Sequence, residues 1–421
     1  MKLNTRAHSD HRAPSMMSPP QPAGNGRPRI ALFTDTGAGR PNGVTTTLDA
    51  VIRHAPPDLD PHVYTLPASD HSAPGYTALA SQRIPIPFGN GAQIHAPRLA
   101  AMSRCLSRDR AVAIHLTTPG PAALLARRLA DRLGLPLLGS YHTELGAYTT
   151  RVGRSRSLGV LVQAYLRWLY GACERILVPS EATRTGLIAH GWKPERLALW
   201  TRGVDTVMFT PERRSSELRR QWHVSDDRPA ILYVGRLSRD TGLELLIPLG
   251  DLLDAHRIPY RLVFAGDGPM LGSLRWRFPD AVFTGSIEHS AVGEVMASAD
   301  LFLFPSETDT AGTVVLEAQA CGLPVLVTDR GGSVEQMADG LTGYVCSAGS
   351  ERDFCWRVAH LVADVERRRA LGRAARGLAL ERTWPDTLRP LFASYRAVIQ
   401  GREAIAGPHR RPSSRAAAHV S

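Results

Sequence analysis

The sequence predicts an α/β protein built from two doubly wound domains, each a parallel sheet with helices on both faces. Short apolar runs alternate with segments of helix length from Arg29 onward, which is the pattern of crossover-connected parallel strands. A Pro- and charge-rich stretch at 210–229 interrupts this alternation once, and the alternation then restarts. The 421 residues also exceed what one hydrophobic core usually supports. Because ligands of open α/β sheets bind beyond the carboxyl ends of the strands, two such domains would face each other across a ligand cleft.

The apolar runs give the expected strands and the domain limits. In the first domain they are 29–34, 62–66, 111–116, 135–141, 175–179 and 197–200, and in the second 230–234, 261–265, 281–284, 300–305 and 324–328. The sequence predicts a first domain at 29–205 and a second domain at 206–384, with a linker near 205–228. A disordered leader (1–28) would precede them. A helix that packs back on the first domain (385–401) and a flexible basic tail (402–421) would follow. Met16 or Met17 is an alternative start.

Composition favours a cytoplasmic protein. The chain is 43% hydrophobic and 21% charged, and it has neither a bilayer-spanning apolar run nor the apolar block of a signal peptide. Its five cysteines are dispersed without C-x-x-C spacing, which favours reduced thiols over disulfides or a structural metal.

The net charge of +11 comes almost entirely from arginine, since only Lys2 and Lys193 are lysines. This balance suits a phosphate-bearing substrate or an anionic membrane face. Basic and aromatic residues do not interleave, so nucleic acid is not an expected partner. The amphipathic segment 158–169 follows the arginines Arg151, Arg154 and Arg156. It is either a packed helix or a contact with a membrane surface or an acceptor lipid.

Glycines and one arginine directly follow two of the predicted strands of the second domain. Gly235 and Arg236 follow one strand, and Gly266 follows the next. A glycine there lets the backbone approach a ligand, and arginine binds phosphate with two parallel hydrogen bonds. Each motif alone is as consistent with an ordinary turn; together they indicate a phosphate site.

The loop after strand 300–305 and the helix that follows it each carry a candidate carboxylate. Asp309 lies in the loop, and a helix is expected to open at Gly312, Thr313 and Val314, whose N–H groups would face a phosphate. Glu317 lies about one turn into this helix, where its carboxylate could bind sugar hydroxyls.

The first domain offers its own strand-end candidates. Asn42 and Gly43 open a helix after the first strand, so their N–H groups are available to a ligand. His142 and Glu144 follow strand 135–141, where a His-Thr-Glu sequence is more typical of a site than of a capped loop. Arg202 lies in the sequence Arg-Gly-Val-Asp that closes the domain.

These motifs together resemble the retaining GT-B glycosyltransferases of family 4, especially bacterial mannosyl-, glucosyl- and sulfoquinovosyltransferase-like members. The matching stretches, in order, are TDTGAGRPNGVTTTL, SYHTELGAYT, VPSEATRTGL, TRGVDTVMFTPERR, LYVGRLSRDTGLELL, VFAGDGPM, VFTG and FPSETDTAGTVVLEAQACGLPVLVTDRGG, and ERTW resembles the last helix of the family. The resemblance implies a GT-B fold and metal-independent transfer of a hexose from a nucleotide-diphosphate sugar to a lipid or glycan acceptor, with no further cofactor.

The resemblance also implies residue roles. Arg236, His142 and Asp309 become the catalytic residues, with Arg236 stabilising the departing diphosphate and Glu317 holding the ribose hydroxyls. The donor site would take Gly43, Asn42, Gly235, Arg239, Gly266, Gly312, Thr313, Val314 and Glu317. The acceptor side would take Glu144, Tyr148 and Arg202.

The chain departs from the family pattern at several of these positions. Thr241 stands where members usually carry a lysine, and Arg239 is the nearest substitute cation. Asp309 is shorter than the usual glutamate, and Ala311 and Thr313 replace the usual Phe and Asn. A lost charge-assisted contact to a leaving group lowers the rate by roughly two decades. The second reading is therefore a weakened or inactive GT-B module that binds nucleotide or a partner subunit; a sugar-nucleotide epimerase or a phosphorylase is a third.

Overall fold

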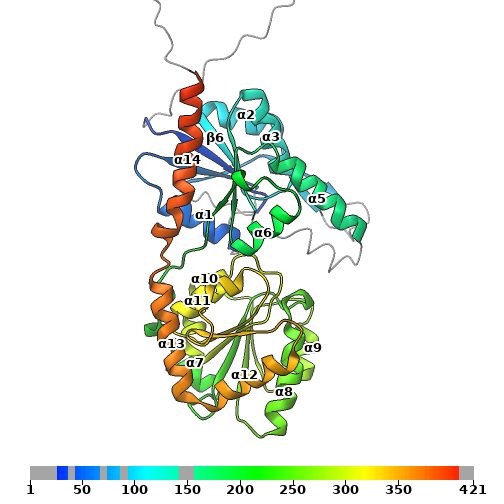
Figure 1. The fold of residues 1–421 in the computed structure, drawn as a ribbon, viewed down its shortest axis with the longest axis vertical. Helices are drawn as coiled ribbons and strands as arrows, with labels where there is room; N and C mark the ends of the chain where they lie inside the picture. The colour runs from blue at the N-terminus through cyan, green and yellow to red at the C-terminus, as the bar shows by residue number, and fades with distance from the viewer. Residues whose placement is uncertain (1–25, 37–42, 67–73, 86–92, 142–155, 407–421) are drawn as a thin grey trace, which may run out of the picture.

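Two parallel β-sheets, each covered by helices on both faces, form two lobes stacked along the long axis of the molecule (Figure 1). The computed structural model describes residues 26–36, 43–66, 74–85, 93–141 and 156–406. The predicted fold class, two doubly wound Rossmann-like domains, is confirmed.

The N-terminal lobe contains a seven-stranded sheet of order β3-β2-β1-β6-β7-β8-β9 in which every pairing is parallel. Its strands are β1 (Arg29–Phe33), β2 (Asp60–Thr65), β3 (Tyr76–Ala78), β6 (Ala111–Leu116), β7 (Leu137–Ser140), β8 (Arg175–Val178) and β9 (Leu197–Leu199). Its helices are α1 (Gly43–Arg53), α2 (Leu99–Arg108), α3 (Pro121–Leu133), α5 (Arg156–Tyr170) and α6 (Glu181–Ala189), and β4 (Ser81–Pro85) pairs with β5 (Gln93–Pro97) in an antiparallel two-stranded sheet.

Alternation along the central strand β1 divides the core of this lobe in two. Ala31 and Phe33 face the cluster that contains residues of α2, α3, α5 and α6. Ile30 and Leu32 face the opposite cluster, with residues of α1 and of the C-terminal helix α14 (Trp384–Ala406). Successive strand side chains point to opposite faces, so one apolar run is buried on both sides.

The C-terminal lobe contains a six-stranded parallel sheet of order β12-β11-β10-β13-β14-β15. Its strands are β10 (Ala230–Val234), β11 (Arg261–Ala265), β12 (Val282–Gly285), β13 (Leu301–Phe304), β14 (Val325–Thr328) and β15 (Gly343–Cys346). Its helices are α7 (Ser216–Gln221), α8 (Leu246–Ala255), α9 (Leu271–Arg277), α10 (His289–Ser298), α11 (Thr313–Ala320), α12 (Glu351–Ala363) and α13 (Val365–Leu380).

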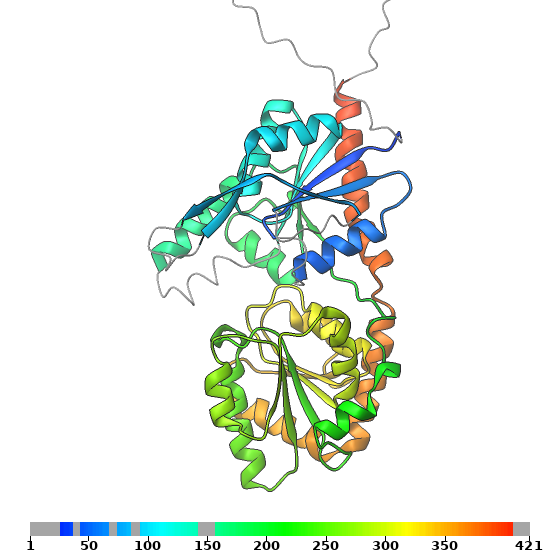
Figure 2. The ribbon, with the colours of Figure 1, turned by 180° about the vertical axis from the view of Figure 1, so that it is seen from behind.

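The chain crosses between the lobes twice, and the two crossings pair with each other. Val204 on the outward crossing forms a parallel bridge with Thr383 on the return, and its N–H donates to the carbonyl of Arg382 at 3.0 Å. Gly203 leaves no room for a side chain, because a Cβ there would lie 2.6 Å from the Cα of Trp384. From this point α14 runs up the N-terminal lobe in line with α13 below it (Figures 1 and 2).

The structure differs from the expected elements in three respects. Strands β3 and β15 and the β4–β5 sheet were not predicted, and the terminal helix is longer than the expected 385–401. The stretch near 205–228, expected as a linker, packs on the C-terminal lobe, because Arg214 and Arg219 both form ion pairs with Asp300, at 2.7 and 2.9 Å.

Candidate active site

The glycines that follow strands β10 and β11 of the C-terminal lobe bring the backbones of the two loops into contact. After β10, Gly235 has a φ of 146°, and after β11, Gly266 has a φ of 147°, both in the region that favours glycine. A Cβ on Gly266 would collide with the carbonyl of Gly235, and one on Gly268 would collide with the carbonyl of Leu237. These contacts bring the two loops together by backbone alone and fix the start of the loop that carries Arg236.

Arg236 extends from this loop as an exposed cation. Its backbone carbonyl accepts a hydrogen bond from the hydroxyl of Tyr233 at 3.0 Å, which holds the residue from below. Among the described residues its guanidinium has no ion-pair partner. An anchored arginine without a protein counter-charge is suited to bind a phosphate.

Thr241, which stands where the family usually carries a lysine, and the nearby Arg239 both contact other protein groups. Thr241 donates its hydroxyl proton to the carbonyl of Ser238 at 2.7 Å, so it closes the turn after Arg236. The side chain of Arg239 is 86% exposed and lies 3.7 Å from Glu244. In this geometry Arg239 is directed to a neighbouring carboxylate in solvent, and its substitution for the lysine stays a prediction.

Asp309 braces the loop between β13 and α11. One of its carboxylate oxygens accepts hydrogen bonds from the N–H groups of Ala311, at 3.0 Å, and Gly312, and from the Ser333 hydroxyl, at 3.3 Å. The N–H of Gly312, which was expected to face a phosphate, is thus bound to Asp309. The N–H groups of Thr313 and Val314 have no acceptor within the part of the chain described, and they remain available at the start of α11.

Glu317 lies one turn into α11, and its side chain is buried. The residue is only 8% exposed, and no described residue donates a hydrogen bond to its carboxylate. Burial without a partner penalises the charged form and raises the pKa of Glu317 to about 8. A buried carboxylate without a partner lacks hydrogen-bond donors, and ligand hydroxyls can supply them.

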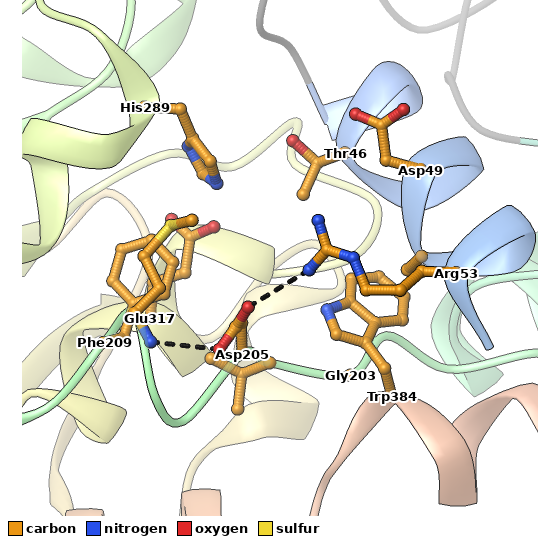
Figure 3. A pocket seen from close by; sticks show the side chains of 12 residues that line it. Thr46, Asp49, Arg53, Gly203, Asp205, Phe209, His289, Glu317 and Trp384 are labelled. Atoms are coloured by element: carbon orange, nitrogen blue, oxygen red, sulfur yellow. Dashed lines mark hydrogen bonds and ion pairs between the residues drawn. The ribbon is translucent and has the colours of Figure 1, made fainter. Parts of the chain in front are cut away.

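Glu317 contributes to a pocket between the two lobes (Figure 3). The pocket is lined by Thr46, Asp49, Ala50 and Arg53 from α1, by Gly203, Val204, Asp205, Met208 and Phe209 from the outward crossing, and by His289, Glu317 and Trp384. Across it, Arg53 of the N-terminal lobe pairs with Asp205 at 3.4 Å. The pocket therefore closes over Glu317 only when both lobes are in place.

His289 is a pocket residue that the sequence reasoning missed. It is the first residue of α10, and its ring packs edge-on against Phe209 with the centroids 5.5 Å apart. Its burial lowers the pKa of the imidazole, although the carboxylates of Asp205 and Asp49 oppose this. The search for candidates after the carboxyl ends of strands could have found His289, because α10 follows β12 after a short turn.

The first-lobe candidates are described only in part. Gly43 is exposed at the start of α1, and a Cβ there would meet no atom within 4 Å. Arg202, expected on the acceptor side, is 4% exposed, donates to the carbonyl of Trp200 at 3.2 Å and stacks over that indole. Burial lowers the pKa of Arg202 to about 10, and the charge of Asp309 opposes this. Asn42, His142, Glu144 and Tyr148 lie outside the described residues.

The fold and the site together define a GT-B glycosyltransferase. Residues 41–207 match the model of Glycosyltransferase Family 4, and residues 214–378 match that of Glycosyl transferases group 1. A GDP-mannose-dependent alpha-mannosyltransferase from Mycolicibacterium smegmatis is 31% identical over 90% of this chain and 99% of the relative. A sulfoquinovosyl transferase from Arabidopsis thaliana is 33% identical over 72% of this chain, which spans 60% of that relative's length.

Solved structures show the same fold. The Anabaena protein HepE, in a crystal structure with UDP and glucose, superposes with a TM-score of 0.71 at 18% identity, covering 87% of this chain and 99% of HepE. The chain belongs to the family 4, group 1 glycosyltransferases, and it transfers a hexose from a nucleotide-sugar donor.

Arg236→Ala should weaken nucleotide-diphosphate binding about 10- to 100-fold, because a charge-assisted phosphate contact contributes about 1.5–3 kcal/mol. Isothermal titration with GDP and UDP measures the change. Arg239→Ala is the matched control, and we expect it to alter the Kd less than about twofold because Arg239 pairs with Glu244. Equal losses in the two variants would make Arg239 the second phosphate cation.

Glu317→Gln should change the dependence of stability on pH. Between pH 4.5 and pH 8 the folded protein keeps a proton on Glu317 that the unfolded chain releases, so the wild type loses stability as the pH rises through this window. The variant lacks this loss, and its free energy of unfolding relative to wild type should increase from pH 5 to pH 8 by about 1–3 kcal/mol. Urea denaturation at several pH values measures it, with the exposed Glu366→Gln as control. Parallel pH profiles for wild type and Glu317→Gln would contradict the burial argument.

Proposed function

We propose that the enzyme transfers mannose from GDP-mannose to a lipid or glycan acceptor, with retention of anomeric configuration and without a divalent metal. The proposal rests on three groups of the C-terminal lobe that have no partner among the described residues: the guanidinium of Arg236, the N–H groups of Thr313 and Val314 at the start of α11, and the buried carboxylate of Glu317. The loop that carries Arg236 touches the loop before α11, since the Thr308 hydroxyl donates to the Asp240 carbonyl at 3.3 Å. The mannosyl donor is taken from the relatives that match most of the chain.

These groups suit a reaction in which a diphosphate departs. The bond between the sugar C1 and the diphosphate oxygen breaks, the nucleoside diphosphate leaves, and the acceptor hydroxyl oxygen bonds to C1. Arg236 and the N-terminus of α11 place positive charge where negative charge develops on the leaving group. Glu317 would accept hydrogen bonds from the ribose hydroxyls, which supply the donors that its carboxylate lacks.

A donor screen tests the function directly. Release of GDP, UDP or ADP from the matching hexose donors would be followed with lipid and glycan acceptors, and product configuration would be read from the one-bond coupling between C1 and H1 of the transferred sugar. We expect turnover with GDP-mannose and an α-linked product. Turnover only with another donor would replace the mannosyl assignment, and a β-linked product would exclude retention.

Thr241 keeps a second candidate function open, a nucleotide-binding module with weakened catalysis. Thr241→Lys places a second cation near the diphosphate, and we expect it to raise kcat/KM about tenfold or more. Thr241→Val is the control, because it removes the hydroxyl that closes the turn without adding charge. Nucleotide binding with no turnover in any of the three proteins would favour the binding module.

We also propose peripheral contact with an anionic membrane through α5. Val160 and Leu161 are 68% and 67% exposed, and Trp168 is 51% exposed two turns further along the same side of the helix. The Arg127 guanidinium lies 4.0 Å from the Trp168 ring centroid, and Arg167 is exposed beside it. Apolar side chains flanked by arginines fit the boundary between acyl chains and anionic headgroups. No helix in the described ranges is long and apolar enough to cross a bilayer.

The double variant Val160→Glu/Leu161→Glu should lower partitioning onto vesicles of phosphatidylglycerol and phosphatidylcholine about tenfold or more, because each apolar side chain contributes about 1.5–3 kcal/mol when buried. Sedimentation at two salt concentrations measures it. Trp276→Glu is the matched control, since this tryptophan is also exposed but lies on α9 of the other lobe. An equal loss in the control would assign the contact elsewhere.

A further inference from the structure

A carboxylate of the C-terminal lobe caps a helix of the N-terminal lobe. Glu335 lies in the short 3-10 helix η5 (Ser333–Gln336). One of its carboxylate oxygens accepts the N–H of Glu181 at 2.9 Å, and the other accepts the N–H of Ala182 at 2.7 Å. Both N–H groups belong to the first turn of α6, so the contact joins the lobes directly.

With the two Glu335 contacts, each of the first four N–H groups of α6 has a hydrogen-bond acceptor. Helices leave their first N–H groups without intrahelical acceptors. Here the N–H of Thr183 donates to the Ser180 side chain at 3.1 Å, and that of Arg184 donates to the Ser180 carbonyl at 3.0 Å. Glu335 accepts the remaining two, those of Glu181 and Ala182. The N-terminus of α6 is therefore fully satisfied only while the lobes are together, and the positive end of the helix favours the carboxylate.

The same short helix supports the loop between β13 and α11. Ser333 donates to Asp309, the Gln336 amide donates to the carbonyl of Ala311 at 3.0 Å, and the N–H of Gly332 donates to the carbonyl of Asp309 at 2.7 Å. A Cβ on Gly312 would lie 2.7 Å from the Gln336 side chain and 2.9 Å from the Cα of Ser333. Any shift of η5 must therefore move the loop that opens α11.

The segment that returns to the N-terminal lobe also contacts η5, through Arg382. Arg382 donates to the carbonyl of Glu335 at 3.3 Å and to the side-chain oxygen of Gln336. Arg382 also accepts, through its own carbonyl, the N–H of Val204 on the outward crossing. One four-residue helix thus contacts the crossing between the lobes, the start of α11 and, through Glu335, the facing lobe.

We propose that Glu335 is a positioning residue that couples closure of the two lobes to the position of the loop between β13 and α11. The inference rests on the proposed function, because that loop forms part of the proposed donor site. Opening the cleft breaks two charge-assisted hydrogen bonds and leaves the α6 N-terminus to water. The nucleotide groups Arg236 and Glu317 both belong to the C-terminal lobe, so loss of the cap should spare nucleotide binding and impair the step that needs both lobes.

The test compares Glu335→Ala and Glu335→Gln with the wild type, using small-angle scattering, titration with GDP, and steady-state kinetics. We expect the radius of gyration of the unliganded protein to increase by about 1 Å or more as the lobes separate. The nucleotide Kd should stay within about twofold, and kcat should fall about tenfold or more. Glu335→Gln, which keeps one acceptor oxygen, should lie between Glu335→Ala and wild type in both measurements. Glu181→Gln is the control, because it removes a carboxylate from the same end of α6 but keeps the capped N–H.

An unchanged radius of gyration in Glu335→Ala, or an equal increase in Glu181→Gln, would overturn the proposal. A loss of GDP binding as large as the loss of kcat would also overturn it, since Glu335 would then only support the loop. The scattering comparison needs no substrate, so it separates failure of this proposal from failure of the proposed function. If no sugar donor is turned over, scattering still reports whether Glu335 holds the lobes together.

Discussion

The paired crossing of the chain between the lobes is the constraint on which the site depends. Val204 and Thr383 hold the outward and return segments side by side, and Gly203 lets them approach at Trp384. Everything that lines the pocket around Glu317 is arranged about this point: α1 on one side, α10 and α11 on the other, and the crossing itself between them. Neither lobe forms that pocket alone. The return helix α14 then buries Leu388, Leu391 and Tyr395 in the N-terminal lobe, so the second crossing is as firmly anchored as the first.

The proposed nucleotide-binding face is built mainly from backbone. Gly235, Gly266 and Gly268 let two strand exits touch without side chains between them, and Arg236 is presented from the loop that they define. Asp309 plays a supporting part in the same construction, because it binds the turn before α11 and the neighbouring Ser333. Among the residues that the structure describes, the groups of this site without a protein partner are the Arg236 guanidinium, the N–H groups of Thr313 and Val314, and the Glu317 carboxylate. Their chemistries match a diphosphate and a pair of hydroxyls, as a nucleotide sugar presents them.

The sequence predicts the two sheets and the strand-end candidates because both follow from local patterns. Strands such as Ala230–Val234 are apolar on both faces, and the residue after a parallel strand must lie at the ligand edge. Three-residue β3 and glycine-led β15 carry too little pattern to be recognised. The burial of Arg202 against Trp200 and the position of Arg239 near Glu244 are directions of flexible side chains, which no spacing rule specifies. The contact of Asp309 with Ser333 joins loops far apart in the sequence. The position of His289 after β12 was visible in the sequence, but its contact with Phe209 of the outward crossing was not.

The buried carboxyl group of Glu317 would make the stability of the protein depend on its proposed ligand. Its burial disfavours the charged form, which lowers the stability of the folded state at neutral pH and above. A ligand that binds only the folded form lowers the population of unfolded chains, by a free energy that grows with its concentration. If a nucleotide sugar binds at Glu317 as proposed, its concentration would therefore set part of the stability of the folded enzyme.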